Sequence, residues 1–127
     1  MKIPTVMERQ GYTIIPCLDF DRHILEVLPL YLEALRSLDV PPPIVVMLTL
    51  EGVHGAVLGV SEEQLLFHRH PILQSVLELP EIIVEDYGTA QDYQRIVRPA
   101  FDALWNAGGF SASQYFNADG VWTGPRQ

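Results

Sequence analysis

A pair of histidines is the first group of side chains that could carry out chemistry. His68 and His70 are two positions apart in "HRH", so both imidazoles would point the same way in an extended segment. Imidazole is a zinc ligand, and His54 with Glu51 could complete the site of a metal-assisted hydrolase. The alternative is a pair of exposed loop histidines before Pro71. Because the sequence has no C-x-x-C or H-E-x-x-H motif, we expect no bound metal.

A second group lies at Asp19 to His23, which reads "DFDRH". Its two carboxylates and one imidazole could act as general acid and base. The same stretch falls where a helix is expected to begin, and aspartate there accepts backbone N–H bonds, so we favour capping. Nearby Cys17 lies among apolar residues of a predicted strand. Since reactive thiols need electropositive surroundings, we expect a buried structural cysteine and no catalytic residue here.

The stretch Asn117 to Gly120 resembles part of a calcium loop. The spacing of an EF-hand would place Tyr115 and Arg126 at the first and twelfth positions, where neither residue type binds calcium. We therefore interpret the stretch as a turn. The sequence also contains no glycine-rich phosphate-binding motif and no G-x-S-x-G motif, so we expect no cofactor.

Residues 101–110 read "FDALWNAGGF" and combine a tryptophan with two glycines. Phe101 and Trp105 are four residues apart and share one face of a helix. Gly108 falls where a helix commonly ends in a left-handed residue, and Phe110 could fold back onto the last turn. We favour a capped helix that packs an aromatic pair into the core. The alternative is a ring-lined ligand pocket near Trp105 and Tyr115.

Four segments have the residue types of β-strands. They are residues 12–18 with Pro16 inside, 44–50, 56–60, and 75–87 with Pro80 inside. Proline cannot donate to a strand ladder, so the first is expected at a sheet edge. The nearly continuous apolar run at 44–50 is expected at the centre of the sheet, in a hairpin with the third segment.

Three segments have helical patterns. The first starts at the aspartates and ends before the prolines at 41–43, with Pro29 expected to kink it or delay its start. Ser61 and Gln64 form a possible capping box for a short helix through Phe67. Thr89 is expected to cap one final helix with a single apolar side, formed by Tyr93, Ile96, Val97, Ala100, Phe101 and Leu104.

These elements predict a single α+β domain over residues 1–127. The expected order is β-α-β-β-(α)-β-α, with a mostly antiparallel sheet and two main helices packed on one face. The chain is 48% hydrophobic and 19% charged, which is typical of a globular protein with its own core.

The net charge of −8 comes from 16 acidic and eight basic residues, among which Lys2 is the only lysine. Proteins that bind nucleic acids gain most of their affinity by neutralising phosphates with lysine and arginine. We therefore expect no direct nucleic-acid binding. Cys17 is the only cysteine, there is no long apolar run, and "MKIPTVMERQ" has no signal-peptide block. These features predict a cytoplasmic protein without membrane contact.

The stretches "LPEIIVEDY" and "RPAFDALWNAGGFSASQYFNADGVW" resemble the C-terminal accessory region of certain bacterial proteins. Those proteins carry a Schlafen/AlbA-type DNA-binding (ATP-binding) domain in front of this region. The upstream stretch "DFDRHILEVLPLYLEALRSLDVPPPIVVML" also resembles that region, so the resemblance covers nearly the whole chain. It implies an accessory module without the front domain and assigns no catalytic residue to this region.

The leading functional hypothesis is a non-catalytic binding or assembly module of a larger regulatory or defence-type bacterial protein. A small-molecule sensor with a pocket near Trp105 and Tyr115 is one alternative. A metal-assisted hydrolase using His54, His68 and His70 is the other. A module predicts exposed apolar surface, whereas a hydrolase predicts that the histidines converge.

We also expect a homodimer. Leu25 and Leu32 widen the apolar face of the first helix beyond the stripe that contains Tyr31, and a helix apolar over that width is normally covered on two sides. The predicted edge strand at 12–18 has no lysine or glutamate to prevent pairing. A second copy is therefore expected to bury part of that helix or of that strand.

Overall fold

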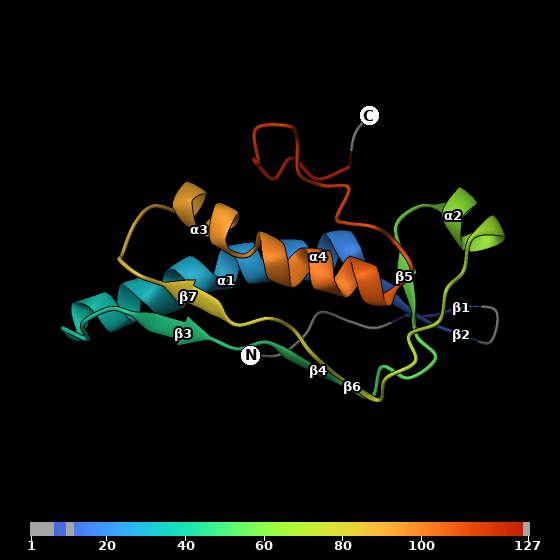
Figure 1. Ribbon diagram of the computed structural model, residues 1–127, viewed down its shortest axis with the longest axis horizontal. Helices are drawn as coiled ribbons and strands as arrows, with labels where there is room; N and C mark the ends of the chain where they lie inside the picture. The colour runs from blue at the N-terminus through green and yellow to red at the C-terminus, as the bar shows by residue number, and fades with distance from the viewer. Residues whose placement is uncertain (1–6, 10–11, 126–127) are drawn as a thin grey trace.

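The computed structural model describes residues 7–9 and 12–125. Lys2 and most of the segment examined for a signal peptide lie outside the described residues. Figure 1 shows two long helices above a long ribbon of strands. The described elements are β1 (Met7–Arg9), β2 (Tyr12–Pro16), α1 (Cys17–Ser37), β3 (Ile44–Val46), β4 (Thr49–Glu51), β5 (Val57–Gly59), α2 (Glu62–Phe67), β6 (Val76–Glu78), β7 (Ile82–Val84), α3 (Ala90–Ile96) and α4 (Arg98–Ala107).

The predicted α+β class is confirmed. Of the four described strand pairs, only β2 with β5 is parallel, and the two long helices lie on the same side of the ribbon. The described order is β-β-α-β-β-β-α-β-β-α-α, which has more elements than expected. The expected final helix is in fact two, α3 and α4. Pro99 separates them because it has no N–H and its ring crowds the carbonyl one turn earlier.

The ribbon is formed by residues 44–51 against residues 76–84. β3 pairs with β7, and β4 pairs with β6, both antiparallel. Between these pairs, Val46 to Thr49 spans three steps, while the opposing Glu78 to Ile82 spans four. The second strand therefore carries one extra residue at Pro80–Glu81, which is a β-bulge. The predicted interruption at Pro80 is confirmed. The expected single strand at 44–50 is divided into β3 and β4 opposite this interruption.

The strand at 12–18 is not an edge strand. β2 lies in the middle of the three-stranded sheet, between β1 and β5. Pro16 is tolerated because it is the last residue of β2, opposite Gly59, where the strand passes into α1. The expected hairpin is also wrong, because β5 pairs with β2 and β4 pairs with β6. Since both sides of β2 are paired, a second copy cannot add to it.

α1 starts earlier than the sequence suggests. Its first residue is Cys17 and its N-cap is Pro16, which makes no side-chain capping bond, so the aspartates do not cap the helix. Pro29 lies inside the helix rather than at its start. The C-terminal end is closed by Asp39, which has a φ of 58°, and by a hydrogen bond from Val40 N–H to the Leu35 carbonyl.

The other predicted N-caps are confirmed. The Ser61 hydroxyl accepts a bond from the Gln64 N–H at the start of α2. Thr89 and Asp92 form a capping box at the start of α3. Both caps depend only on residues three apart in sequence, which is why the sequence identifies them.

α4 ends in a Schellman motif, but the left-handed residue is Gly109 and not Gly108. Gly109 has a φ of 90°, while Gly108 has a φ of −89°. Phe110 N–H donates to the Trp105 carbonyl at 2.9 Å, and Gly109 N–H donates to that of Asn106 at 3.0 Å. The rings of Phe110 and Trp105 are in contact, as is common for this motif.

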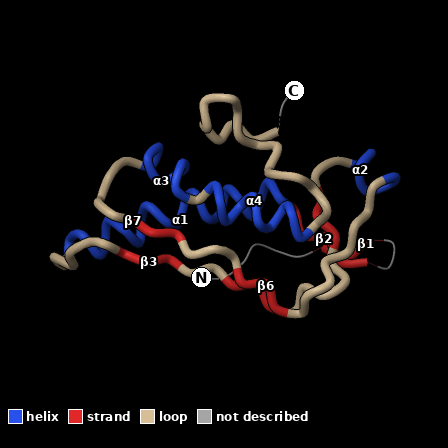
Figure 2. The backbone as a smooth tube through the Cα atoms, viewed as in Figure 1, coloured by secondary structure: helices blue, strands red, loops and turns tan. Residues whose placement is uncertain are grey.

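One apolar core joins the helices, the ribbon and the C-terminal segment. It contains Phe20, Ile24, Leu28 and Leu32 of α1, Phe101, Leu104 and Trp105 of α4, and Leu50, Leu77, Ile82 and Val84 of the ribbon. Residues 108–125 contain neither a helix nor a described strand. Beyond the end of α4, this segment passes to the side of the long helices that faces away from the ribbon (Figure 2).

Gly108→Ala should destabilise the protein through packing. A Cβ at this position would overlap Cγ of buried Leu58, while the backbone φ of −89° is ordinary. We expect a loss of about 1–3 kcal/mol in the free energy of unfolding, measured by urea denaturation. Gly52→Ala is the comparison, because Gly52 has a positive φ and open space around it. This variant measures the cost of backbone strain without a clash, whereas Gly108→Ala measures the cost of a clash without backbone strain. Wild-type stability of Gly108→Ala would contradict the packing argument.

Candidate functional site

The aromatic rings at the end of α4 lie in the core. Trp105 is fully buried, and its ring makes edge-to-face contacts with Phe110 and Tyr115, each at 5.0 Å between centroids. Tyr115 in turn contacts Trp122 at 6.3 Å. Trp105 is therefore a packing residue, as the favoured interpretation predicts.

Beneath these rings lies a buried carboxylate. Asp21 is fully buried on α1, and its Oδ2 accepts a hydrogen bond of 2.9 Å from Nε1 of Trp122. Its Oδ1 has no hydrogen-bond partner among the described residues, and neither has Nε1 of Trp105. Burial raises the pKa of Asp21 to about 7, although the bond from Trp122 lowers it. The bond joins the C-terminal segment to α1.

Cys17 and Tyr115 are close enough to Asp21 for its charge to affect them. Burial, and then the charge of Asp21, raises the pKa of the Cys17 thiol. Burial also raises the pKa of Tyr115, followed by the charges of Cys17 and Asp21. The thiol is therefore protonated and enclosed, which is the opposite of what a nucleophile needs. The predicted burial of Cys17 is confirmed, although it lies at the start of a helix and not in a strand.

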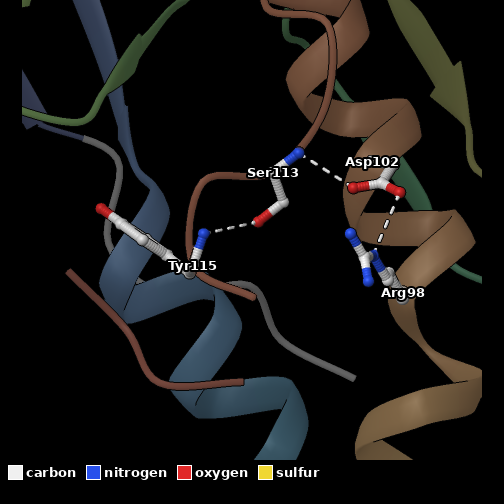
Figure 3. Close-up of polar contacts among 4 residues, drawn as sticks. All are labelled: Arg98, Asp102, Ser113 and Tyr115. Carbon is white, nitrogen blue, oxygen red and sulfur yellow. Dashed lines mark hydrogen bonds and ion pairs between the residues drawn. The ribbon is translucent and has the colours of Figure 1, made fainter. Parts of the chain in front are cut away.

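A polar chain holds the next part of the C-terminal segment against α4 (Figure 3). Oδ1 of Asp102 accepts a bond of 2.9 Å from the Ser113 N–H, and its Oδ2 lies 3.7 Å from Nε of Arg98. The Ser113 hydroxyl accepts a bond from the Tyr115 N–H. Arg98 also lies over the ring of Phe116, 5.0 Å from its centroid. These contacts position the segment and engage both carboxylate oxygens of Asp102.

A cavity of about 450 Å³ lies beside this segment. Its lining residues are Val60, Ser61, Ser113, Gln114, Tyr115, Phe116 and Pro125. Tyr115 therefore lines a cavity, as the sensor hypothesis expects, but Trp105 does not. The lining contains no charged side chain, so the cavity offers few groups that could select a ligand.

The candidate histidines do not come together as a metal site. His54 is exposed in the turn after β4, His68 caps the C-terminal end of α2, and exposed His70 lies near Gly109. Within residues 7–9 and 12–125, no group of three histidine, cysteine or acidic side chains could hold a metal ion. The hydrolase hypothesis therefore has no site in the described structure.

The stretch Asn117 to Gly120 forms the predicted turn. Oδ1 of Asn117 accepts bonds from the N–H groups of Asp119 and Val121, and Gly120 has a φ of 78°. The side chain of Asn117 therefore replaces a backbone acceptor, as is common in Asx turns.

The ribbon presents a second candidate site that the sequence analysis missed. From residue 44 to residue 51, the odd-numbered residues are exposed and the even-numbered ones face the core. We call the exposed side the outer face. It contains Val45, Met47, Thr49, Glu51, Val76, Glu78 and Ile83. The sequence does not reveal this alternation, because most residues of the run at 44–50 are apolar on both the exposed and the inward side.

Asp21 should make stability depend on pH. The pKa of Asp21 is about 7 in the folded protein, whereas the ordinary value, which applies to the unfolded chain, is 3.8. At a pH between these two values, the folded state therefore holds a proton that the unfolded state has lost. This contribution is greatest below pH 3.8 and is lost as the pH rises to about 7. Asp21→Asn should flatten this dependence and exceed wild-type stability at about pH 8, measured by urea denaturation across pH. Asp19→Asn, at an exposed position of the same helix, should retain the wild-type dependence. Parallel curves for wild type and Asp21→Asn would contradict the assignment.

The thiol of Cys17 should be inert in the folded protein. Because it is fully buried and its pKa is raised, a colorimetric disulfide reagent should react only after urea unfolds the chain. Ser37→Cys in a Cys17→Ala background places a thiol at an exposed position of the same helix and should react at once. Rapid reaction of Cys17 without urea would show that the thiol is accessible.

Comparison of the chain with protein-family models, curated proteins and solved structures finds no match. The resemblance to the Schlafen/AlbA-associated region therefore stays a prediction. Within the described part of the chain, no helix is both long enough and apolar enough to cross a membrane.

Proposed function

We propose that the protein is a non-catalytic binding and assembly module that associates with a second copy of itself. The observation that carries this proposal is the exposure of large apolar side chains on regular elements. They include Leu30, Tyr31 and Leu38 on or next to α1, Leu66 and Phe67 on α2, and Val45, Met47, Val76 and Ile83 on the ribbon. Apolar surface of this kind is typical of contact sites between macromolecules.

The geometry of the polar groups supports the same function. The most perturbed carboxylate, Asp21, is fully buried beneath aromatic rings. The cavity next to Tyr115 lacks charged side chains, and the described histidines belong to no group of three side chains that could hold a metal ion. An enzyme needs reactive groups that a substrate can reach, whereas a binding module needs surface.

Self-association is assigned to α1. The core side of this helix contains Ile24, Leu28 and Leu32, so Leu32 does not widen an outer stripe as expected. The exposed stripe instead contains Leu30, Tyr31, Ala34 and Leu38. These four side chains are uncharged, so the stripe itself places no charge in a contact between two copies.

The wider setting of the module follows from the sequence. The net charge of −8 disfavours binding to nucleic acids, and a single buried cysteine suits the reducing cytoplasm. The resemblance would make the module an accessory part of a larger bacterial protein of regulatory or defence type. In that setting, a self-associating module would bring the attached domains together.

Sedimentation equilibrium should detect a dimer that depends on the α1 stripe. The double variant Leu30→Gln/Leu38→Gln should raise the dimer dissociation constant by about tenfold or more, because both side chains leave the interface. Glutamine keeps the helix propensity high at these positions. Leu73→Gln, at a comparably exposed position away from α1, is the control and should leave association unchanged. A monomeric mass for the wild type at every concentration would refute self-association.

A further inference from the structure

The outer face of the ribbon is an apolar surface with nothing packed on it in the described structure. Val45 and Ile83 lie directly opposite each other across the β3–β7 pair, and they are 47% and 50% exposed. Met47, two residues further along the same side, is 70% exposed. Side chains of this kind on a sheet normally lie beneath a second layer.

A groove of about 410 Å³ adjoins this face, between β7 and α3. Apolar residues of its lining are Ile83, Val84, Tyr93 and Ile96, and its acidic residues are Glu85, Asp86 and Asp92. Hydrogen bonds from Thr89 lower the pKa of Asp92, which keeps its carboxylate charged. The groove thus combines an apolar wall with three exposed carboxylates, which suits the stem and the charged end of a lysine or arginine.

The charge of the ribbon restricts which molecule can cover it. Residues 44–51 and 76–86 contain five acidic residues and no basic one. A second copy placed with its own outer face against this surface would bring carboxylates together, which is unfavourable. Arg95 of α3 attracts Asp92 but does not line the groove. The complement of this surface is therefore both apolar and positively charged.

We propose that the outer face and the adjoining groove bind a basic amphipathic helix of another protein. Its apolar side packs on Val45, Met47 and Ile83, and one of its lysine or arginine side chains enters the groove towards Glu85 and Asp86. A helix is the expected form because a helix covers the open face of a two-stranded ribbon as a second layer. The inference deepens the proposed function by naming the partner chemistry of a surface separate from the α1 stripe.

A synthetic amphipathic helix of leucine and lysine, with a fluorescent label, is the probe. Anisotropy should show saturable binding to the 127-residue chain that weakens as salt is added. Val45→Ser/Ile83→Ser and Glu85→Gln/Asp86→Asn should each raise the dissociation constant by about tenfold or more. Leu66→Ser/Leu73→Ser, at exposed apolar positions on and after α2, should bind like the wild type. Circular dichroism checks that each variant is folded.

Three results would overturn the inference. One is equal binding of a peptide with glutamate in place of lysine. Another is unchanged binding by both the apolar and the acidic variant, which would place the peptide elsewhere. The third is a dimer that Val45→Ser/Ile83→Ser dissociates, since a second copy would then cover the outer face. If the peptide does not bind but the protein still forms its α1-dependent dimer, the proposed self-association remains intact. The proposals for the ribbon and for α1 can therefore fail separately.

Discussion

The inner face of the ribbon has to be covered, and the rest of the structure follows from that constraint. A ribbon of two strands cannot bury its apolar side chains by itself. α1 and α4 provide the cover, and they place Leu28, Phe101 and Leu104 in the same core as Leu50, Ile82 and Val84. A ribbon has two faces, however, and the described helices cover only one of them. The exposed outer face is therefore a direct consequence of how the inner face is buried.

The side of the helices that faces away from the ribbon is covered by the C-terminal segment after α4, which has no helix or described strand. Polar groups in the core hold this segment in place. Trp122 reaches Asp21 across 101 positions of sequence, and Asp102 holds the backbone of Ser113. These bonds satisfy groups that burial would otherwise leave unpaired, but Oδ1 of Asp21 and Nε1 of Trp105 still lack described partners. Burying a carboxylate in this way disfavours its charged form. The buried carboxylate of Asp21 thus attaches the C-terminal segment to α1 through Trp122.

The functional conclusion depends on where reactive and apolar groups lie. Carboxylates with structural roles are buried or hydrogen-bonded, while large aliphatic side chains are exposed on α1 and on the ribbon. The two apolar surfaces differ in charge. The stripe on α1 is uncharged and suits an identical partner, whereas the ribbon is acidic and suits a basic one. The proposed module, which joins copies of itself and captures a basic segment of another protein, would account for both surfaces.

The sequence by itself determined the features that depend on neighbouring residues. The caps at Ser61 and Thr89, the interruption at Pro80 and the turn at Asn117 each involve contacts within a few positions, and the α+β class follows from such elements. Only the tertiary structure decided that β5 pairs with β2, that Asp21 is buried rather than capping a helix, and that the ribbon has an open acidic face. Strand partners and burial depend on residues far apart in the chain, and several pairings satisfy the same local pattern. The free energy of packing the whole core selects among them, which is why the strand at 12–18 became central despite its proline.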